Sequence, residues 1–409
     1  MKNTHPMLLF LLAAATAVQA QGPLTPPGAP APTMKTLDQI EPRIPITNLP
    51  FSVFSPGSYY LTGNLAYSFT NQPAIQVFVG GVTIDLNGYT IINFGGTDTI
   101  YCQALGLSSL TIKNGLILLG KHAVYAPLME GVRLEQVEIS NASRTGVVAG
   151  ANAQILNSKF YQSLSGDGVV VGAGSRVIDS VFQGNQKHGL VVGSGSVIEA
   201  CHSSGNAGAG FVLEQGSVLR NSSAESNQIY GVFSYQGGLL ENLTLLYNRA
   251  GAVVGNGTRI SGCSIRHSVQ EGIYGDNEVS VERTTVAASG QRGIFLFNGG
   301  LVRDCIVRAN QQAGILVHSG CAVLDNVVDL NGAGNNEGGI AVYGSSNRIE
   351  GNHITSNADK GLWLLSGGNT VFKNSLRGNG TAISDGGGND VGPQDPAGIA
   401  TSPWANITY

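Results

Sequence analysis

The chain has 409 residues and a formal net charge of −4 at pH 7, and 12% of its residues are charged. An acidic balance without basic clusters argues against nucleic acid as a partner. Charged residues are about half as frequent as the roughly 25% of ordinary globular proteins, and the 58 glycines suit tight, repeated turns. No segment beyond the N-terminus has eighteen uninterrupted apolar residues, so no membrane span is predicted.

The N-terminus has the pattern of a secretory signal peptide over residues 1–20. Its apolar run, residues 7–15, is too short to cross a bilayer, and small residues precede a cleavage site after Ala20. We therefore expect a secreted or periplasmic protein. Residues 21–54 follow as a Pro-rich linker and N-terminal cap, in which the spacing of apolar residues over 34–40 predicts a short helix.

The central part of the chain is a repeat in which a glycine precedes a short apolar strand. The interval is 20 to 22 residues, with a single interval of 25 that contains the insertion Gly332 to Glu337. A fixed period in this range is typical of a solenoid, whose repeats bury their apolar sides only by stacking. The repeat glycines are Gly146, Gly168, Gly189, Gly210, Gly231, Gly251, Gly272, Gly293, Gly314, Gly339 and Gly361.

The residue pattern within each repeat predicts two or three short strands and no helix. The residues one and three positions after each glycine are mostly aliphatic, and strand alternation points both to one side, the core. This favours an all-β parallel β-helix of about 21 residues per coil over a leucine-rich repeat, which needs a denser leucine consensus. The β-helix is expected over residues 55–385, with residues 386–409 as a C-terminal cap that covers the open sheet edge.

Asparagine recurs four residues before many of the repeat glycines. Stacked amides can bond the coils on either side and satisfy turn backbone groups. We expect a structural ladder here, with metal binding or glycosylation as the alternative. Its predicted members are Asn185, Asn206, Asn227, Asn310 and Asn357, with Ser268 and Ser289 in two gaps and Asn248 one residue out of phase.

These features, together with Gly-Val-Thr-Ile-Asp-Leu-Asn-Gly at 81–88 and Leu-Thr-Ile-Lys-Asn-Gly at 110–115, carry a family resemblance. The chain resembles the right-handed parallel β-helix superfamily that includes pectate lyases and polygalacturonases. The resemblance covers roughly residues 55–390 and implies a right-handed, single-stranded β-helix. It does not select a reaction, because the polygalacturonase Asp-Asp and Arg-x-Lys, the mannuronan epimerase Asp-Pro-His-Glu and the pectate lyase Arg-x-Pro-x-x-Arg are absent. Lys187-His188-Gly189 only approaches the polygalacturonase Gly-His-Gly.

The cysteines predict neither a disulfide nor a zinc site. Cys201, Cys263 and Cys305 occupy one inward slot, three and two coils apart, which exceeds the roughly 7 Å limit for a disulfide. We interpret them as small buried hydrophobes. No resident cofactor or metal is predicted, because no loop has a recognisable ligand spacing. The many Asp and Asn residues nevertheless leave calcium binding open.

The outward positions of the repeat strand, two and four residues after the glycine, are apolar or aromatic. A contiguous apolar strip usually marks a contact surface, and aromatic faces along it would stack against sugar rings. Cover by a terminal tail or burial in a homo-oligomer interface is the alternative. The predicted substrate-binding residues are Tyr235, Tyr274, Phe295, Phe297, Tyr343 and Trp363.

Ionisable residues lie beside this strip. Glu271 and Arg292 directly precede repeat glycines in adjacent coils, and Asp276 and His318 lie within the strip. A lyase needs a base and a cation that neutralises a uronate carboxylate, whereas a hydrolase needs two carboxyl groups. These four residues are the predicted catalytic set, and a solvated salt bridge is the alternative.

Three functions therefore follow from the sequence. The first is a secreted protein that engages polysaccharide along the aromatic strand face as a polysaccharide lyase or glycoside hydrolase. The second is a non-catalytic carbohydrate-binding module that uses the same face. The third is a surface or structural module that assembles through the apolar strip.

Overall fold

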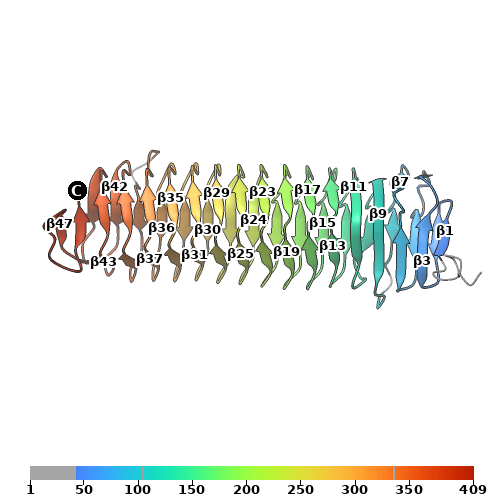
Figure 1. Cartoon of the computed structure of the whole chain (residues 1–409), viewed down its shortest axis with the longest axis horizontal. Coiled ribbons are helices and arrows are strands. Elements are labelled where there is room, and N and C mark those ends of the chain that lie inside the picture. The colour runs from blue at the N-terminus through green and yellow to red at the C-terminus, as the bar shows by residue number, and fades with distance from the viewer. Residues whose placement is uncertain (1–42, 104, 335–336) are drawn as a thin grey trace, which may run out of the picture. The chain divides into compact units, whose positions relative to one another are not determined.

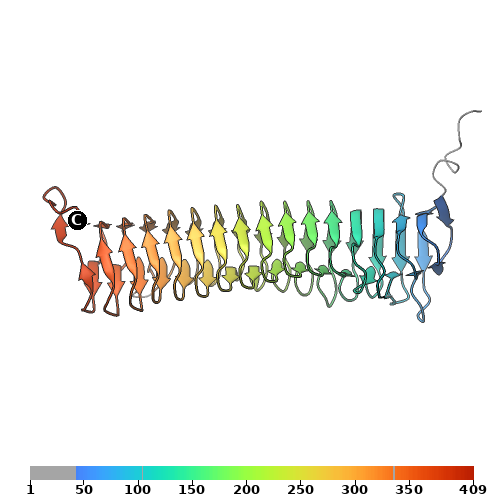
Figure 2. The same cartoon turned by 90° about the horizontal axis from the view of Figure 1, so that it is seen from below.

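The computed structural model describes residues 43–103, 105–334 and 337–409. The predicted signal peptide and the short helix lie outside these residues, and only residues 43–54 of the predicted linker and cap are described. Residues 44–409 form one compact unit, in which parallel strands stack coil upon coil (Figures 1 and 2). The described residues contain no helix, and hence none that could cross a membrane.

One strand of each coil belongs to sheet B, which has sixteen parallel strands in chain order. At roughly 4.8 Å per strand, sixteen coils span about 70 Å. The strands of sheet B are β2 (Phe51–Val53), β5 (Ile75–Val77), β8 (Ile100–Tyr101), β10 (Val124–Ala126), β12 (Val147–Ala149), β15 (Val169–Val171), β18 (Leu190–Val192), β21 (Phe211–Leu213), β24 (Tyr230–Ser234), β27 (Ala250–Val254), β30 (Ile273–Gly275), β33 (Ile294–Leu296), β36 (Ile315–Val317), β39 (Ile340–Val342), β42 (Lys360–Leu364) and β45 (Thr381–Asp385).

The other strands form sheet A, which consists of two ladders joined by two long strands, β9 (Leu110–Leu119) and β11 (Arg133–Ser140). The first ladder contains β3 (Gly57–Leu61), β6 (Val82–Asp85), β13 (Gln154–Leu156), β16 (Arg176–Ile178), β19 (Val197–Glu199), β22 (Val218–Arg220), β25 (Leu239–Glu241), β28 (Arg259–Ser261), β31 (Ser280–Glu282), β34 (Leu301–Arg303), β37 (Ala322–Leu324), β40 (Arg348–Glu350), β43 (Thr370–Phe372) and β46 (Asp390–Val391). A further strand, β1 (Arg43–Ile46), precedes them.

The second ladder of sheet A supplies the third strand of each coil. It contains β4 (Leu65–Tyr67), β7 (Thr90–Asn93), β14 (Lys159–Tyr161), β17 (Val181–Gln183), β20 (His202–Ser204), β23 (Ser223–Glu225), β26 (Thr244–Leu246), β29 (Ser264–Arg266), β32 (Thr285–Ala287), β35 (Ile306–Arg308), β38 (Val327–Asp329), β41 (His353–Thr355), β44 (Ser375–Arg377) and β48 (Asn406–Thr408), with β47 (Gln394–Pro396) paired to β48. The predicted parallel β-helix is therefore confirmed, with three strands per coil. The C-terminal segment continues the stack, because β48 pairs with β44.

The repeat glycines are required by the close stacking of the coils. A Cβ atom on Gly189 would lie 2.7 Å from the carbonyl oxygen of Gly210 and 2.9 Å from the Asn206 amide nitrogen. The same two kinds of neighbour recur at Gly231 and Gly293. Glycine is therefore the residue that lets each sheet B strand approach the next coil and its ladder amide.

The asparagine ladder is confirmed, and it is longer than the sequence spacing indicated. Asn206 donates its side-chain amide (2.9 Å) and its backbone N–H (3.2 Å) to the Asn227 side-chain oxygen. Asn227 bonds Asn248 in the same way, so the expectation that Asn248 is out of phase is wrong. The repeat that contains Asn248 has 20 residues and is therefore one residue short. The missing residue falls after Asn248, so Asn248 keeps its place in the ladder. The ladder consists of Asn185, Asn206, Asn227 and Asn248, then Asn310, Asn331, Asn357 and Asn379.

The five cysteines are buried free thiols. Cys201, Cys263 and Cys305 share one slot with Asn326, which accepts the backbone N–H of Cys305 at 2.9 Å. The thiols also donate to backbone carbonyls, as from Cys305 to Arg303 at 3.2 Å. The interpretation as plain hydrophobes is therefore incomplete, because this slot is a second polar ladder. Burial raises the pKa of the Cys201 thiol to about 12.

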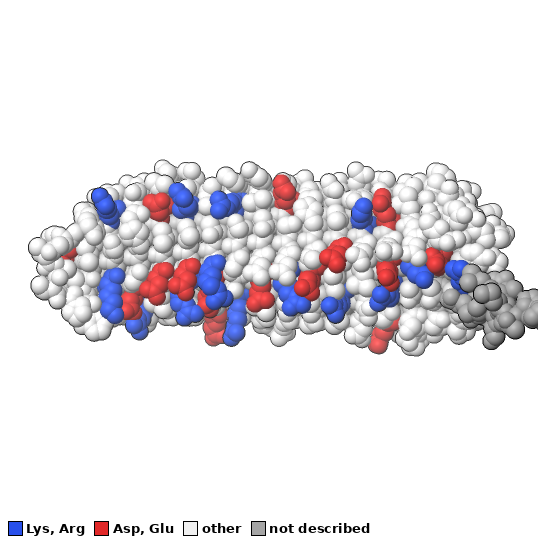
Figure 3. Space-filling model, in the orientation of Figure 1, with Lys and Arg blue, Asp and Glu red and all other residues white. Residues whose placement is uncertain are grey.

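Charged side chains gather in two rows on the face that Figure 3 shows, with an uncharged band between them. Opposite charges pair between coils along the first ladder of sheet A, as Arg220 does with Glu199 at 2.9 Å and Lys373 with Glu350 at 2.9 Å. These ion pairs join successive coils, and exposed pairs of this kind contribute about 0–1 kcal/mol.

Candidate functional site

The outward side of sheet B carries a row of side chains that runs from coil to coil. In the three-residue strands the first and third residues point into the core, so Ile294 and Leu296 are fully buried while Phe295 between them is half-buried. In the five-residue strands β24, β27 and β42 the third and fifth residues are the inward ones, and the residue between them is counted here as the middle residue. In-register parallel pairing places each middle residue beside its counterpart in the next coil. From β21 to β42 the middle residues are Val212, Phe233, Val253, Tyr274, Phe295, Leu316, Ala341 and Trp363.

A second outward row, which we call the edge row, lies two residues beyond the middle residue of each strand. Alternation brings it to the same side of the sheet. All six predicted substrate-binding residues, and Asp276 and His318 of the predicted catalytic set, lie in these two rows. From β21 to β39 the edge row is Glu214, Tyr235, Gly255, Asp276, Phe297, His318 and Tyr343.

Neighbouring rings in these rows touch, and together they form what we call the aromatic run. Tyr274 contacts Phe295 at a centroid distance of 5.2 Å, and Tyr343 contacts Trp363 at 6.1 Å. A separate group, Phe233 and Tyr235 at 5.0 Å, lies on the other side of the coil of β27. The members of the aromatic run are Tyr274, Phe295, Phe297, His318, Tyr343 and Trp363.

The prediction of a uniformly outward, exposed strip needs one correction. Leu316 and Ala341 are 1% and 0% exposed and pack against Phe295, Tyr343 and Trp363. Their side chains are smaller than the surrounding rings, which cover them. This packing fixes the positions of the rings, so the aromatic run is a supported surface rather than a set of isolated side chains.

A buried charge cluster lies beside the aromatic run. Arg292 binds Glu337 with both ends of its guanidinium, Nη2 to Oε1 at 2.8 Å and Nε to Oε2 at 3.1 Å. Glu337 also accepts the Ala313 backbone N–H (3.2 Å) and the Tyr343 hydroxyl (3.3 Å). Glu271 lies 4.0 Å from Arg292 on the other side. One cation is therefore placed between two carboxylates, next to the rings of Phe295 and Tyr343.

The pKa values in this cluster follow from burial and charge. Burial by itself lowers the pKa of Arg292, but the hydrogen bonds and charge of Glu337 outweigh it and raise the pKa. Burial also raises the pKa of the Tyr343 hydroxyl, and the Glu337 charge adds to this. Arg292 is thus charged and Tyr343 protonated at neutral pH, which keeps the cluster fully paired.

Glu337 was missed in the sequence, although the insertion that ends with it was noticed. Its signal was an acidic residue that closes a Gly- and Asn-rich insertion, two coils beyond an arginine. Glu337 lies 45 residues from Arg292 along the chain. The path of an insertion is not fixed by the repeat, so sequence periodicity could not assign this partner.

The four predicted catalytic residues are not all brought into one cluster. Glu271 and Arg292 are adjacent, and the Gln291 amide donates to Glu271 at 2.7 Å in the orientation that satisfies both groups. His318 stacks on Phe297 at 5.1 Å and is a member of the aromatic run. Within the described ranges, no hydrogen bond or ion pair joins Asp276 or His318 to Glu271 or Arg292.

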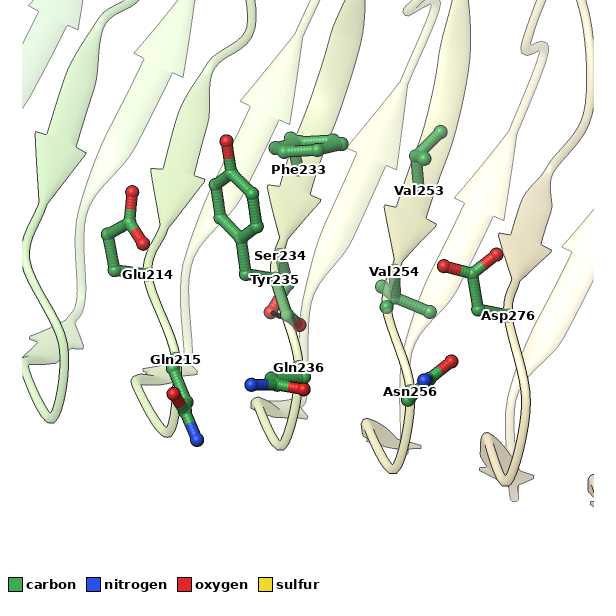
Figure 4. A pocket seen from close by; sticks show the side chains of 11 residues that line it. Glu214, Gln215, Phe233, Ser234, Tyr235, Gln236, Val253, Val254, Asn256 and Asp276 are labelled. Atoms are coloured by element: carbon green, nitrogen blue, oxygen red, sulfur yellow. Dashed lines mark hydrogen bonds between the residues drawn. The ribbon is translucent and has the colours of Figure 1, made fainter.

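Asp276 instead lines a pocket where the aromatic rows are interrupted (Figure 4). Tyr274, two residues earlier, has a raised pKa because of burial, and the charges of Asp276 and Glu271 add to this. The pocket has a volume of about 390 Å³, within the usual range for small-ligand sites. Its other polar side chains include Glu214 and Asn256.

Two histidines that could act as acid or base have structural partners. His188, in the Lys187-His188-Gly189 sequence, accepts the Ala209 backbone N–H at its Nδ1 at 2.9 Å. His122 is buried, and its Nδ1 lies 2.7 Å from Asp98. Asp98 and His122 occupy the same position within their coils, just before the sheet B strand, as Glu271 and Arg292 do, but they belong to the N-terminal coils. The sequence did not reveal this pair because the spacing there is less regular.

No group of three or more His, Cys, Asp or Glu side chains within residues 43–103, 105–334 and 337–409 could hold a metal ion. The outward side of sheet B, by contrast, offers rings, carboxylates and amides along one continuous face.

Solved structures with a similar chain path have low sequence identity to this protein. The Azotobacter vinelandii mannuronan C-5 epimerase AlgE4 A-module is 17% identical, with 87% of this chain and 91% of that chain covered and a TM-score of 0.42. The AlgE6 A-module from the same organism is 15% identical, with coverages of 86% and 90% and a TM-score of 0.41. The Dettilon tailspike protein is 13% identical, with coverages of 86% and 61% and a TM-score of 0.33. At these values the likeness supports no statement about activity.

Comparison with sequence families gives the assignment that the strand pattern anticipated. A search of curated protein sequences found no match. The profile described as "Right handed beta helix region" matches residues 81–239 and 234–380, which include the repeat glycines, the asparagine ladder and the aromatic run. The chain therefore belongs to the right-handed β-helix family.

Proposed function

We propose that this protein binds a polysaccharide chain along the outward side of sheet B, with sugar rings packed on the aromatic run. The single observation that carries the proposal is the unbroken ring contact from Tyr274 to Trp363 across the coils of β30, β33, β36, β39 and β42. The C–H side of a pyranose is apolar and carries partial positive charge, so it packs on the negative face of an aromatic ring. A chain of sugars would thus meet one ring after another.

The surroundings of the aromatic run suit a ligand with many hydroxyl groups. Lys360 lies over Trp363 at 4.7 Å and Arg292 over Phe295 at 5.3 Å. Asp276 and Glu271 lie on its other margins. Polar groups beside apolar ring faces fix the orientation of a ligand, whereas the rings contribute most of the buried area. As residues 1–20 predict export, the ligand proposed is extracellular.

The test is binding of the purified full chain to a panel of neutral and acidic polysaccharides, measured by affinity electrophoresis and calorimetry. Trp363→Ala should weaken binding about tenfold, because it removes one stacking partner worth roughly 1.4 kcal/mol. Tyr247→Ala is the matched control, because Tyr247 is an exposed ring (56%) outside the two rows. Equal affinity of both variants, or no binding across the panel, would contradict the proposal.

A second candidate function is chemistry on the bound glycan, as a lyase or glycoside hydrolase. The observation that favours it is the cluster of Glu271, Arg292, Glu337 and Tyr343 beside the aromatic run, because carboxylates, a cation and a hydroxyl are the groups that acid–base chemistry on a sugar needs. New reducing ends with ultraviolet absorbance would indicate a lyase, and reducing ends alone a hydrolase. Loss of product in Glu271→Gln, with binding retained, would place the chemistry at this cluster.

Assembly through the same face is the competing possibility. An oligomer that buries the aromatic run would leave no surface for a glycan. Sedimentation of the full chain, with and without a bound polysaccharide, separates the two. A stable oligomer that Trp363→Ala dissociates would replace our proposal.

A further inference from the structure

The feature that carries a further inference is the gap in the aromatic rows at the coil of β27. On either side the middle residues are Phe233 and Tyr274, but here the middle residue is Val253. The edge residue of the same coil is Gly255, which has no side chain. Two missing side chains on one coil leave a hollow between ring-bearing neighbours. The aromatic surface is therefore not uniform along its length but contains a built recess.

The recess is a pocket of about 390 Å³. In Figure 4 Phe233 and Tyr235 stand on one side and Asp276 on the other, with Val253 and Val254 between them and Glu214 one coil beyond Tyr235. Tyr235 is 47% exposed, so one face of its ring is free for contact. The apolar base and the exposed ring face suit the C–H side of a sugar ring.

The polar lining of the pocket is acidic and amide-rich. Glu214 and Asp276 occupy the same edge position three coils apart, and Gln215, Gln236 and Asn256 lie at the rim. In the described part of the chain neither carboxylate has a hydrogen-bond or ion-pair partner. No lysine, arginine or histidine is among the lining residues. The carboxylates are thus acceptors without donors, and the pocket has no cation that would balance an anionic ligand.

This lining selects the class of sugar. Carboxylates accept hydrogen bonds from hydroxyl or ammonium groups, and charge-assisted bonds are the strong ones. A uronate or a sulfated sugar in the recess would bring a negative charge toward the unpaired Asp276 carboxylate, which is unfavourable, and the more distant Glu214 charge adds to this. At roughly 4.8 Å per coil, Glu214 and Asp276 are too far apart for one metal ion to bridge them. The chemistry therefore favours a sugar that donates hydrogen bonds and carries no negative charge.

We propose that the recess at Val253 and Gly255 is a subsite for one sugar residue without negative charge, held between the Tyr235 ring and the Asp276 carboxylate. This inference rests on the proposed polysaccharide binding and specifies its ligand. It makes the coil of β27 the specificity-determining position, whereas the aromatic run contributes general affinity. Neutral sugars and amine-bearing sugars share the required chemistry.

The experiment fills the recess and leaves the rest of the face unchanged. Val253→Phe would continue the aromatic row through the gap, and Val191→Phe makes the same change at the equivalent half-buried position in β18. Binding of neutral glucan and mannan oligosaccharides, chitosan oligosaccharides and oligogalacturonate to the full chain is measured by calorimetry. We expect Val253→Phe to lose at least about tenfold in affinity for the non-acidic ligands, which corresponds to roughly 1.4 kcal/mol, and Val191→Phe to bind like the wild type.

Two further variants test the carboxylates. Glu214→Gln and Asp276→Asn keep shape and remove charge. Asp276→Asn should weaken binding of neutral ligands about threefold to tenfold and relax the exclusion of oligogalacturonate, whereas Glu214→Gln, on the far side of Tyr235, should have the smaller effect on both. Tighter binding of the neutral oligosaccharides would identify sugar hydroxyl groups as the hydrogen-bond donors, and tighter binding of the chitosan oligosaccharides would identify ammonium groups. Unchanged thermal unfolding midpoints in all four variants show that the fold is intact.

The outcomes separate this inference from the proposed function. If the wild type binds, Trp363→Ala weakens it and Val253→Phe does not, the subsite is wrong and the proposed function stands. If oligogalacturonate binds best and Val253→Phe abolishes that binding, the assigned sugar class is wrong. If no glycan binds the wild type, both fail together.

Discussion

The strands β12 to β21 and the strands β24 to β42 belong to the same sheet but present different surfaces. In the first stretch the outward middle residues are Val148, Val170, Val191 and Val212. In the second they are mostly aromatic, as Phe233, Tyr274, Phe295 and Trp363 show. The inward residues are of one kind in both, for example Leu190 and Ile294, each 0% exposed. The same framework therefore carries either an aliphatic or an aromatic outward surface.

The edge row shows the same contrast and a reason for it. In the valine stretch the edge residues of β12, β15 and β18 are Gly150, Gly172 and Gly193, where a Cβ atom would lie 2.4 to 2.7 Å from backbone of the preceding coil, and only β21 has a side chain there, Glu214. In the aromatic stretch this position accepts Tyr235 and Phe297. The backbone turns differ enough between the two stretches to admit or exclude side chains. The comparison teaches that stability is built from the inward positions and surface chemistry from the outward ones.

The largest expected effect tests whether the two stretches share one core. Leu190→Ala and Ile294→Ala each remove a fully buried side chain, and each should destabilise the protein by about 2–5 kcal/mol. The outward changes Val191→Ala and Phe295→Ala should cost less, because these side chains are half-buried. Denaturant unfolding followed by circular dichroism measures all four. If Phe295→Ala lowered the free energy of unfolding as much as Ile294→Ala, the separation of stabilising inward positions from outward positions would be wrong.

A smaller effect is expected where the asparagine ladder changes to serine. Asn206→Ala in the valine stretch removes the bonds to Asn227 and should cost about 1–3 kcal/mol, since buried groups lose their partners. Ser289→Ala in the aromatic stretch is the matched variant, because the buried Ser289 hydroxyl has no hydrogen-bond partner among the described residues. It should be neutral within about 0.5 kcal/mol. Thermal unfolding of the two variants gives the comparison, and an equal loss would show that Ser289 stabilises the stack in another way.

A third comparison concerns the edge glycines themselves. A Cβ on Gly193 would meet the backbone nitrogen of Ala173 at 2.4 Å, whereas on Gly255 the nearest atom, the carbonyl carbon of Tyr235, lies at 3.1 Å. Gly193→Ala should therefore cost about 1–3 kcal/mol through forced backbone shifts, and Gly255→Ala less than that. Midpoints of denaturant unfolding decide the order. The reverse order would mean that the backbone turns do not govern which side chains the edge admits.

Much of this architecture could be predicted because a β-helix is nearly one-dimensional. Coil length, the inward aliphatic residues and the glycine spacing are local properties that repeat, and each coil contacts only its neighbours. The positions of Tyr274, Phe295 and Trp363 on one face followed from alternation alone. The place of Asn248 in the asparagine ladder did not follow from the sequence, because the single missing residue of its repeat can fall before or after it. Only the hydrogen bonds between the stacked amides show that it falls after Asn248.

The candidate site was less predictable than the fold for the same reason. Glu337 reaches Arg292 from an insertion whose path no repeat determines. The recess at Val253 and Gly255 is visible only when absent side chains are compared with their neighbours in space. The pair of Asp98 and His122 lies in coils whose spacing is irregular.

The sequence by itself determined the solenoid, its period, the buried ladder and the face on which the rings lie, because those properties depend on alternation and on contact between successive coils. The tertiary structure decided which groups meet across coils: the two carboxylates around Arg292, the burial of Leu316 and Ala341, and the recess in the aromatic rows. Those features depend on distances between side chains of different coils and on the path of an insertion, which spacing along the chain does not fix.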